Sequence, residues 1–302
     1  MKTNYTFYTR FNPMLAEKGA AATAEYCVKM GFSSVEVLES TGAGHPTAIP
    51  DTKAAKDVRR ILGDAGLNVA CYSVGTNVVR VDRAQNAVTP DTFAVSSLKK
   101  QAEIAAALGC PYLHHTLFTA LSMPDNPPET KPMLDACAAA AADIAAYAKP
   151  LGVTCIYEDQ GMYVNGIENF GYFYREVKRV SDNVGVCGDV GNILFVDEDP
   201  VSFFAAFADE IRHVHIKDYL HKKTPVSTGN PSVSPGMYWL PTKGGAWLRD
   251  TMTGSGCIDF AGCTEILKKA SYRGAYALEL CHPEPHDPGV EQSMALLDRL
   301  LA

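Results

Sequence analysis

Four polar side chains stand at the ends of four strand-like segments in the second half of the chain. The segments combine β-branched and other apolar residues with polar ones and span residues 153–158, 186–189, 211–218 and 275–279. The polar residues at or near their ends are Glu158, Asp189, His215 and Glu279. Three carboxylates and one imidazole form a ligand set that suits a divalent cation. Mn²⁺ is our first choice for this cation, and Mg²⁺, Co²⁺ and Zn²⁺ are the alternatives.

A metal is indicated by the four residues together and by none of them alone. A single Glu at a strand end is more simply interpreted as a solvated or salt-bridged carboxylate. Burying three carboxylates at one place without a cation, however, would cost several kcal/mol and raise their pKa values. Successive strand residues point to opposite faces, so His213 and His215 share one face of their strand. We expect His213 to lie one layer deeper, as a packing residue or as a partner of the ligands.

These side chains can meet only if the strands are parallel and their C-terminal ends lie together. A strand-like run followed by a helix-like run recurs eight times, at residues 5–11 and 15–30, 34–38 and 51–65, 68–74 and 91–108, 112–118 and 132–148, 153–159 and 167–180, 184–190 and 200–207, 211–219 and 260–270, and 275–281 and 290–300. This alternation predicts an α/β fold, a closed (β/α)₈ TIM barrel formed by one domain over residues 1–302. Active sites of such barrels lie at the C-terminal strand ends, and strands about 4.8 Å apart let four neighbours surround one ion.

Two loops could reach the strand ends. The longer is an insertion after the seventh strand, residues 220–257, which is rich in Pro, Gly, Ser and Thr and carries Tyr238 and Trp239. A long loop with aromatic residues at this end of a barrel indicates a lid or a subunit contact, so a dimer or tetramer is compatible with it. As a lid, the insertion would let Trp239 stack on the substrate. The other loop carries His45, which would reach either the substrate or nothing.

Further polar residues near the strand ends are candidate substrate contacts. His114 and His115 are adjacent, so only one can readily face the barrel axis. A core or surface histidine is the simpler interpretation of each taken alone, and we choose His115 as the substrate contact or auxiliary base. Glu36, within the second strand, would bind a substrate hydroxyl or orient Arg10, or else form an ion pair lower in the barrel. Lys217 and Asp218 would bind substrate oxygens or close the barrel rim as a salt bridge.

Composition excludes several classes of protein. The 302 residues are 47% hydrophobic and 20% charged, which is typical of a globular protein. A net charge of −7 argues against nucleic acid as a partner. No apolar run reaches the roughly 18 residues of a membrane span, and the first residues lack the apolar core of a signal peptide. Nine cysteines without a C-x-x-C pair indicate reduced, buried thiols and a cytoplasmic protein.

Several segments of the second half resemble one family. They are E-D at 158–159, G-D-V-G-N at 188–192, H-V-H-I-K-D at 213–218, L-E-L at 278–280 and G-S-G-C-I-D-F at 254–260. This pattern is similar to the sugar-phosphate isomerase/epimerase family of xylose isomerase-like TIM barrels. The resemblance implies the metal ligands given above and a small carbohydrate or cyclitol as substrate. The ketose 3-epimerases of this family commonly place a substrate-binding His where this chain has Asn192, so we take Asn192 as a substrate contact.

The leading hypothesis is a divalent-metal-dependent isomerase or epimerase of a small sugar, keto-sugar or cyclitol. It would abstract a proton next to a carbonyl through a metal-stabilised enediolate, with Glu158 and Glu279 as base and acid. The alternative is a lyase on the same barrel, either a cyclitol dehydratase or a C-glycoside-cleaving enzyme acting on 3-keto-glycosides. A non-catalytic sugar-binding barrel is a minority hypothesis, and the acidic charge counts against an endonuclease IV-like enzyme.

Overall fold

Eight parallel strands form a closed barrel, as the sequence predicts. The computed structural model describes residues 3–40, 47–82, 84–85, 87–118, 127, 129–224, 226 and 238–302, so His45 and the middle of the insertion lie outside the described residues. Around the barrel the strands are β1 (Tyr5–Phe7), β13 (Tyr276–Leu278), β9 (Ile211–Ile216), β8 (Val184–Asp189), β7 (Thr154–Glu158), β6 (Tyr112–His115), β3 (Asn68–Gly75) and β2 (Ser34–Ser40). Pairing of β1 with β2 closes the ring.

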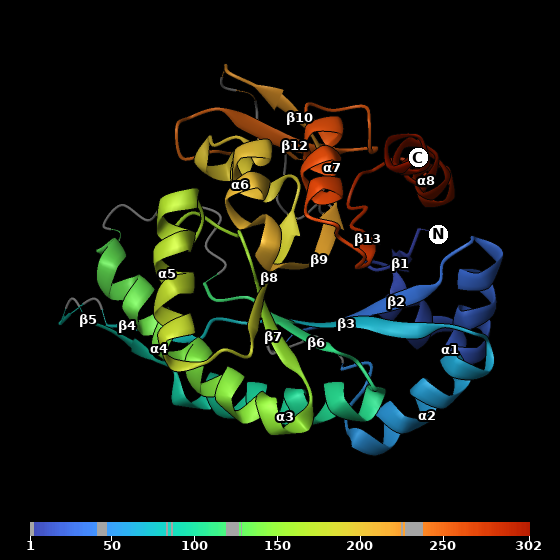
Figure 1. Cartoon of the computed structure of the whole chain (residues 1–302), viewed down its shortest axis with the longest axis horizontal. Helices are drawn as coiled ribbons and strands as arrows, with labels where there is room; N and C mark the ends of the chain where they lie inside the picture. The colour runs from blue at the N-terminus through green and yellow to red at the C-terminus, as the bar shows by residue number, and fades with distance from the viewer. Residues whose placement is uncertain are drawn as a thin grey trace.

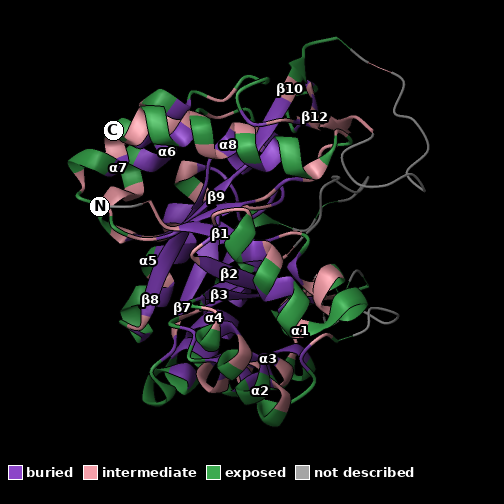
Figure 2. Cartoon of the chain, turned by 90° about the vertical axis from the view of Figure 1, so that its right-hand side faces the viewer, coloured by how far each residue is buried: buried purple, intermediate pink, exposed green. Residues whose placement is uncertain are grey.

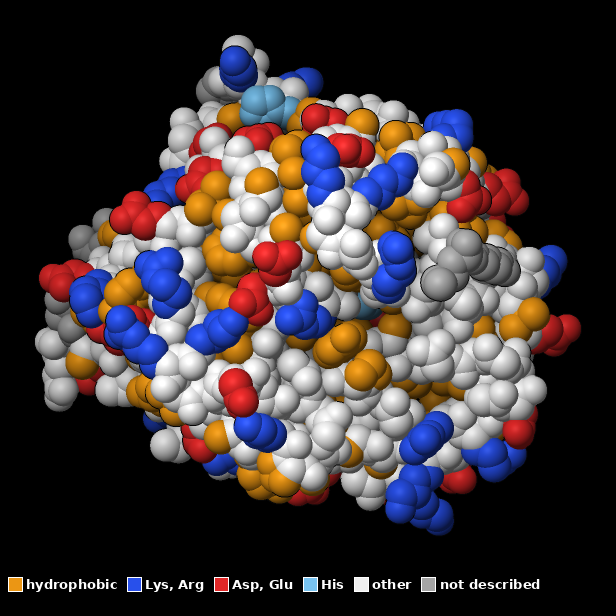
Figure 3. All heavy atoms as spheres, viewed as in Figure 1, with side chains coloured by type: hydrophobic (Ala, Val, Ile, Leu, Met, Phe, Trp, Pro, Cys, Tyr) orange, Lys and Arg blue, Asp and Glu red, His pale blue; other side chains and the backbone are white. Residues whose placement is uncertain are grey.

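Eight helices cover the barrel (Figure 1). They are α1 (Phe11–Lys29), α2 (Thr52–Asp64), α3 (Thr92–Leu108), α4 (Thr130–Ala148), α5 (Ile167–Val180), α6 (Pro200–Phe207), α7 (Phe260–Lys269) and α8 (His286–Leu301). Asp51, Asp91, Asp199 and Asp259 each precede a helix and accept hydrogen bonds from its first backbone N–H groups. None of the described helices is both long and apolar enough to cross a membrane. On the face shown in Figure 3, cationic and anionic side chains are interspersed.

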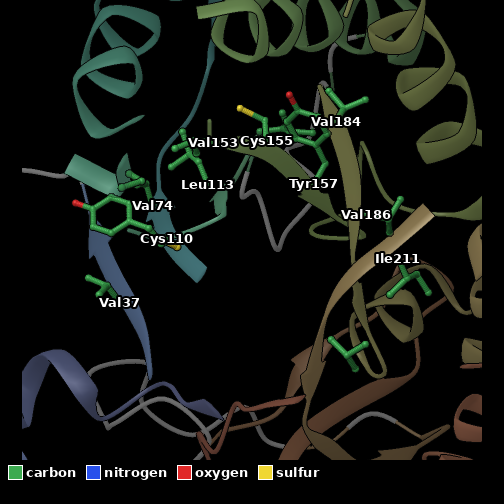
Figure 4. Packing of buried hydrophobic residues seen from close by; sticks show 14 of the residues in the cluster. Val37, Val74, Cys110, Leu113, Val153, Cys155, Tyr157, Val184, Val186 and Ile211 are labelled. Carbon is green, nitrogen blue, oxygen red and sulfur yellow. The ribbon is translucent and has the colours of Figure 1, made fainter. Parts of the chain in front are cut away.

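The two faces of the barrel strands differ in polarity. Side chains on the outer face are apolar and pack beneath the helices, as Figure 4 shows for Val37, Val74, Leu113, Tyr157 and Val186. Side chains on the inner face are largely polar, and they are nevertheless buried, in keeping with the fully buried strands of Figure 2. Since helix packing on the outer face supplies most of the hydrophobic burial, the inner face is free to carry polar chemistry.

The loops contain strands that the periodicity did not indicate. A hairpin follows β3, formed by β4 (Val79–Asp82) and β5 (Ala87–Pro90). The insertion after β9, expected as a loop, holds a three-stranded antiparallel sheet of β10 (Asp218–Lys222), β12 (Trp247–Thr251) and β11 (Leu240–Pro241). Three short 3₁₀ segments, η1 (Lys149–Leu151), η2 (Asn192–Val196) and η3 (Ala208–Glu210), complete the described elements.

Asp218 ties the return of the insertion to the barrel. Its Oδ1 accepts hydrogen bonds from the backbone N–H groups of Tyr219 (2.8 Å) and Ile258 (3.3 Å). Its Oδ2 accepts from those of Gly254 (2.9 Å) and Gly256 (2.8 Å). The carboxylate is buried and four donors converge on it, so it fixes the last turn of the insertion against the start of β10.

We expect Asp218→Asn to loosen this turn. The amide retains only one acceptor oxygen and presents N–H groups to backbone donors, so two hydrogen bonds are lost in a buried place. Amide hydrogen exchange of residues 254–258 should accelerate and the free energy of unfolding should fall by about 1–3 kcal/mol, while exchange in β7 and β8 stays slow. Asp64→Asn, which removes only an exposed ion pair with Arg60, is the control. Unchanged exchange at 254–258 would show that Asp218 does not hold the turn.

Candidate metal centre

The four predicted ligands lie together at the C-terminal ends of their strands. One ligand atom from each of Glu158, Asp189, His215 and Glu279 falls within 4.8 Å of the other three. The Nδ1 atom of His215 lies 2.8 Å from Glu158 Oε1, 3.4 Å from Glu279 Oε2 and 3.9 Å from Asp189 Oδ2. Glu158, Asp189 and His215 are buried, and 18% of the Glu279 side chain is exposed. The imidazole therefore stands in the middle of three carboxylates, one of which borders solvent.

Lys217 brings a second positive charge to these carboxylates. Its Nζ atom donates to Glu279 Oε1 at 2.6 Å and to Asn192 Oδ1 at 3.1 Å, and it lies 3.2 Å from Asp189 Oδ2. Burial on its own would lower the pKa of Lys217, but the Asp189 and Glu279 carboxylates hold it well above its ordinary value. The predicted residues Lys217 and Asn192 thus contact each other and the ligand set.

Glu36 lies below the ligands and holds His215 from the other side. Its Oε1 atom lies 3.1 Å from His215 Nε2, and its Oε2 atom lies 2.7 Å from His213 Nε2. Burial alone would raise the pKa of Glu36, but the two histidines keep it well below its usual range, so the carboxylate is ionised and accepts from both rings. Of the alternatives for Glu36, the structure has the ion pair within the barrel. The Nε2–H group of His215 donates to Glu36, and the opposite ring nitrogen, Nδ1, faces the other three carboxylates.

A chain of contacts joins Glu36 back to Glu158. Ser73 Oγ donates to Glu36 Oε1 at 2.5 Å and lies 3.0 Å from His114 Nδ1. His114 Nε2 lies 3.5 Å from Glu158 Oε2. The three residues that precede Glu158 in this series, Glu36, Ser73 and His114, lie on β2, β3 and β6. Strands of both halves of the barrel therefore hold Glu158 and His215 in place.

The histidine that faces the barrel axis on β6 is His114, which corrects the choice of His115. The His114 ring meets the His215 ring edge to face, with centroids 5.5 Å apart. His115 points to the outer face, where its ring contacts Tyr157 at 5.3 Å and its Nδ1 lies 3.1 Å from the Thr116 carbonyl oxygen. Leu113 also packs on the outer face, so the two-residue period of the strand assigns His115 to that face.

Two other predicted substrate contacts have different surroundings. The carboxylate of Asp218 is engaged by the four backbone donors of the insertion described above. Trp239 lies in the insertion between two cations: Lys222 Nζ is 4.7 Å and Arg249 Cζ is 5.2 Å from the centroid of its ring. Among its contacts with described residues, none is to the four candidate ligands.

Three residues of the site were not singled out by the sequence. Tyr8 stacks on His215 with ring centroids 4.8 Å apart and an angle of 25° between the planes. Ser73 links Glu36 to His114, and buried Asp159 accepts from the backbone N–H of Asp189 at 3.2 Å. Tyr8 directly follows β1, two residues after Thr6, and Ser73 lies on the inner face of β3, two residues after Cys71. The two-residue alternation of side chains along a strand is the signal that indicates both residues.

The negative charge of the centre changes the proton affinity of Glu158. Burial raises the pKa of Glu158 to about 7; His215 opposes this rise, and the carboxylates of Asp189 and Glu279 add to it. Burial also raises the pKa of Asp159 well above its ordinary value, again with help from Asp189 and Glu158. A divalent cation would relieve this repulsion, and the donors present, carboxylate oxygens and one imidazole nitrogen, are those that Mn²⁺, Mg²⁺ or Zn²⁺ accepts. The residues therefore fit the metal that the sequence predicts.

A closed (β/α)₈ barrel with polar residues gathered at the C-terminal strand ends defines the class of this protein. Residues 24–300 match the family model described as xylose isomerase-like TIM barrel. Since the match spans nearly the whole chain, the protein belongs to this family.

Two curated relatives match a shorter part of the chain. "Putative L-ribulose-5-phosphate 3-epimerase SgbU" of Escherichia coli (strain K12) is 31% identical over 103 residues, which are 34% of this chain and 30% of that protein. Inosose dehydratase of Lacticaseibacillus casei is 26% identical over 103 residues, 32% of this chain and 30% of that protein. The match spans less than a third of the length of either relative.

Solved structures match the whole barrel at low sequence identity. A xylose isomerase domain protein from Planctomyces limnophilus is 18% identical, with a TM-score of 0.70 and coverage of 99% of this chain and 98% of the other. The protein IOLI, solved with a zinc atom, is 15% identical, with a TM-score of 0.71 and the same coverage. At these identities the similarity establishes the fold.

The raised pKa of Glu158 predicts a pH dependence of stability in the metal-free protein. Between about pH 4.5 and 7 the folded chain holds a proton on Glu158 that the unfolded chain has released, so this residue destabilises the fold as the pH rises through that window. Glu158→Gln should therefore gain stability relative to the native chain between pH 5 and pH 8, by up to about 3 kcal/mol.

Denaturant unfolding in the presence of a chelator at both pH values measures this difference. Glu168→Gln, at an exposed position in the first turn of α5, is the control and should show no such gain. A difference between native chain and Glu158→Gln that is the same at pH 5 and pH 8 would contradict the raised pKa.

Proposed function

We propose that this protein is a divalent-metal-dependent enzyme that removes a proton next to the carbonyl of a small keto-sugar or cyclitol, and that its reaction is an isomerisation or epimerisation. The observation that carries the proposal is the set Glu158, Asp189, His215 and Glu279, whose ligand atoms fall within 4.8 Å of one another. The epimerase name of the Escherichia coli relative supports the reaction class.

The four residues would hold the cation, with Mn²⁺ as the first choice. The zinc atom of the IOLI structure, which has the same fold, supports a divalent ion as the ligand. When bound, the cation supplies Lewis acidity, which polarises the substrate carbonyl and makes the neighbouring C–H more acidic. Glu36 would keep the proton of His215 on Nε2, 3.1 Å away, and so leave Nδ1 free as a ligand atom.

Glu158 and Glu279 would exchange the proton with the substrate. Burial raises the pKa of Glu158 to about 7 in the metal-free chain; a bound cation would oppose this rise and favour the carboxylate form that accepts a proton. Glu279 borders solvent, and the ammonium of Lys217, 2.6 Å from its Oε1, would hold it in one orientation. Lys217 and Asn192 would also be within reach of substrate oxygens, whereas Asp218 would act by fixing the insertion.

A lyase is the second candidate, because one relative is an inosose dehydratase and Asn192 stands where ketose 3-epimerases commonly have a histidine. Proton abstraction would be the same, but it would be followed by loss of water or of an aglycone. The products separate the two reactions. Isomerisation and epimerisation conserve the substrate mass, while dehydration lowers it by one water.

Glu279→Gln should lower turnover by about 10²- to 10⁴-fold, because the amide cannot accept or return the proton. The measurement is deuterium incorporation from D₂O at the carbon next to the carbonyl, with L-ribulose, D-allulose and an inosose as substrates and with metal content determined in parallel. Glu168→Gln is again the control. Native turnover by a Glu279→Gln protein that binds a full equivalent of metal would remove Glu279 from the mechanism.

Glu36→Gln should weaken Mn²⁺ binding about 10- to 100-fold, since the amide no longer fixes the proton on His215 Nε2. Titration followed by electron paramagnetic resonance of free Mn²⁺ measures the affinity without any substrate. The matched control is Glu39→Gln on the same strand, whose carboxylate binds the backbone N–H groups of Ala48 and Ile49 instead. Equal losses in the two variants would indicate a general loosening of β2 and not a role of Glu36 at the metal.

A further inference from the structure

The inserted sheet turns one carboxylate, that of Asp250, towards the barrel. In the pairing of β10 with β12, Asp250 lies directly opposite Tyr219, so the two side chains share a face of the sheet. Leu248, two residues earlier, is on the same face and is completely buried with Tyr219 and Phe195. Phe195 belongs to η2, which follows the barrel strand β8, so this face of the sheet packs on the barrel. Arg249, between Leu248 and Asp250, points the other way, to Trp239.

The charges of the candidate metal centre change the pKa of Asp250. Burial raises the pKa of Asp250 to about 6; Lys217 opposes this rise, and Glu279 and Asp189 add to it. Its strand partner Tyr219 follows Lys217 by two residues, and a Cβ on Gly191 would come within 3.0 Å of both the Tyr219 ring and the Lys217 side chain. The close packing of β10 on the loop after β8 therefore carries Asp250 to the mouth of the centre.

Unlike other aspartates of this region, Asp250 has only a local backbone hydrogen bond, with its own residue, among the described part of the chain. Asp218 binds four backbone N–H groups, and Asp197 accepts from Thr242 Oγ1 and from the backbone N–H of Gly244. Among the described residues, none donates a side-chain hydrogen bond to Asp250, and no lysine, arginine or histidine nitrogen lies within 4 Å of its carboxylate. An ionised group kept half-buried beside two other carboxylates costs stability, and such a cost is typical of residues retained for binding.

We propose that Asp250 is a specificity-determining residue that accepts a hydrogen bond from a substrate hydroxyl group. The inference rests on the proposed function, because a polyhydroxylated substrate is what offers such donors. Asp250 comes from the insertion and not from a barrel strand, so it would meet a hydroxyl beyond the atoms held at the four-residue centre. A site built to bind a hydroxyl rejects an analogue that lacks it, since the carboxylate is then left unpaired.

The test compares Asp250→Asn with Arg249→Gln, its neighbour on the outer face of the same strand, in the metal-loaded full chain. L-ribulose, D-allulose and an inosose serve as probes, together with single-deoxy analogues of each. For the probe that binds best, Asp250→Asn should raise KM or Kd about 10- to 100-fold. Turnover number and Mn²⁺ affinity should change less than about threefold. One deoxy analogue should show no loss, because it lacks the hydroxyl that Asp250 binds. Arg249→Gln should match the native protein.

A thermal melt without substrate at pH 8 separates binding from structure. Asp250→Asn should raise the Tm of the protein, since it removes a charge disfavoured by its surroundings. If Asp250 were a structural residue, the same substitution would lower Tm. Equal losses for parent and deoxy compounds, no loss for any compound, or a lowered Tm would each overturn the role of Asp250. Binding that depends on Asp250 without turnover would instead refute the proposed function alone, and turnover indifferent to Asp250 would refute this inference alone. Failure of all three probes to bind would reject both.

Discussion

Parallel strands bring several carboxylates to one end of the barrel, and the structure of the site depends on offsetting the repulsion among them. Glu158, Asp189 and Glu279 can approach one another only because His215 and Lys217 stand between them. Each of these cations is itself buried, so each depends on the carboxylates for its charge. Burial is the main cause of the raised pKa of Glu158, and the charges of Asp189 and Glu279 add to it against the opposing effect of His215. A centre of this kind is poised to take up a further positive charge.

Support for the centre extends downward through the barrel and outward to the helices. Glu36 holds both His213 and His215, and Ser73 with His114 returns the contacts to Glu158. A polar interior of this depth contributes little hydrophobic stability. The apolar outer face of the same strands, packed under eight helices, compensates for it. The alternation of strand side chains is thus what allows one barrel to be stable outside and reactive inside.

Much of this could be predicted from the sequence, because period and composition are local signals. The recurring strand–helix pairs predicted the barrel, and the polar strand ends predicted which residues would meet. The choice of His115 over His114 was wrong because the alternation of side chains along β6, in which Leu113 packs outward, places His115 on the outer face. The sheet in the insertion was missed because its strands are short, and their register with β10 depends on tertiary packing. No local pattern distinguishes Asp218, which accepts from the backbone of four other residues, from Asp250, whose backbone hydrogen bond is only with its own residue.

The barrel strands and the insertion contribute different groups to the site. The four strand-end residues are fixed in place by the closure of the barrel, and in the proposed function they would form the centre at which a proton is removed beside a carbonyl. Selectivity among small polyols needs donors and acceptors farther out, and these must come from loops. Only Lys217 separates the end of β9 at Ile216 from the start of β10 at Asp218, so any shift of β10 moves Lys217 and Tyr219 together. Backbone pairing of β12 with β10 therefore fixes the position of a side chain on β12 relative to the centre. A residue of the insertion is thus positioned nearly as precisely as a residue of a barrel strand.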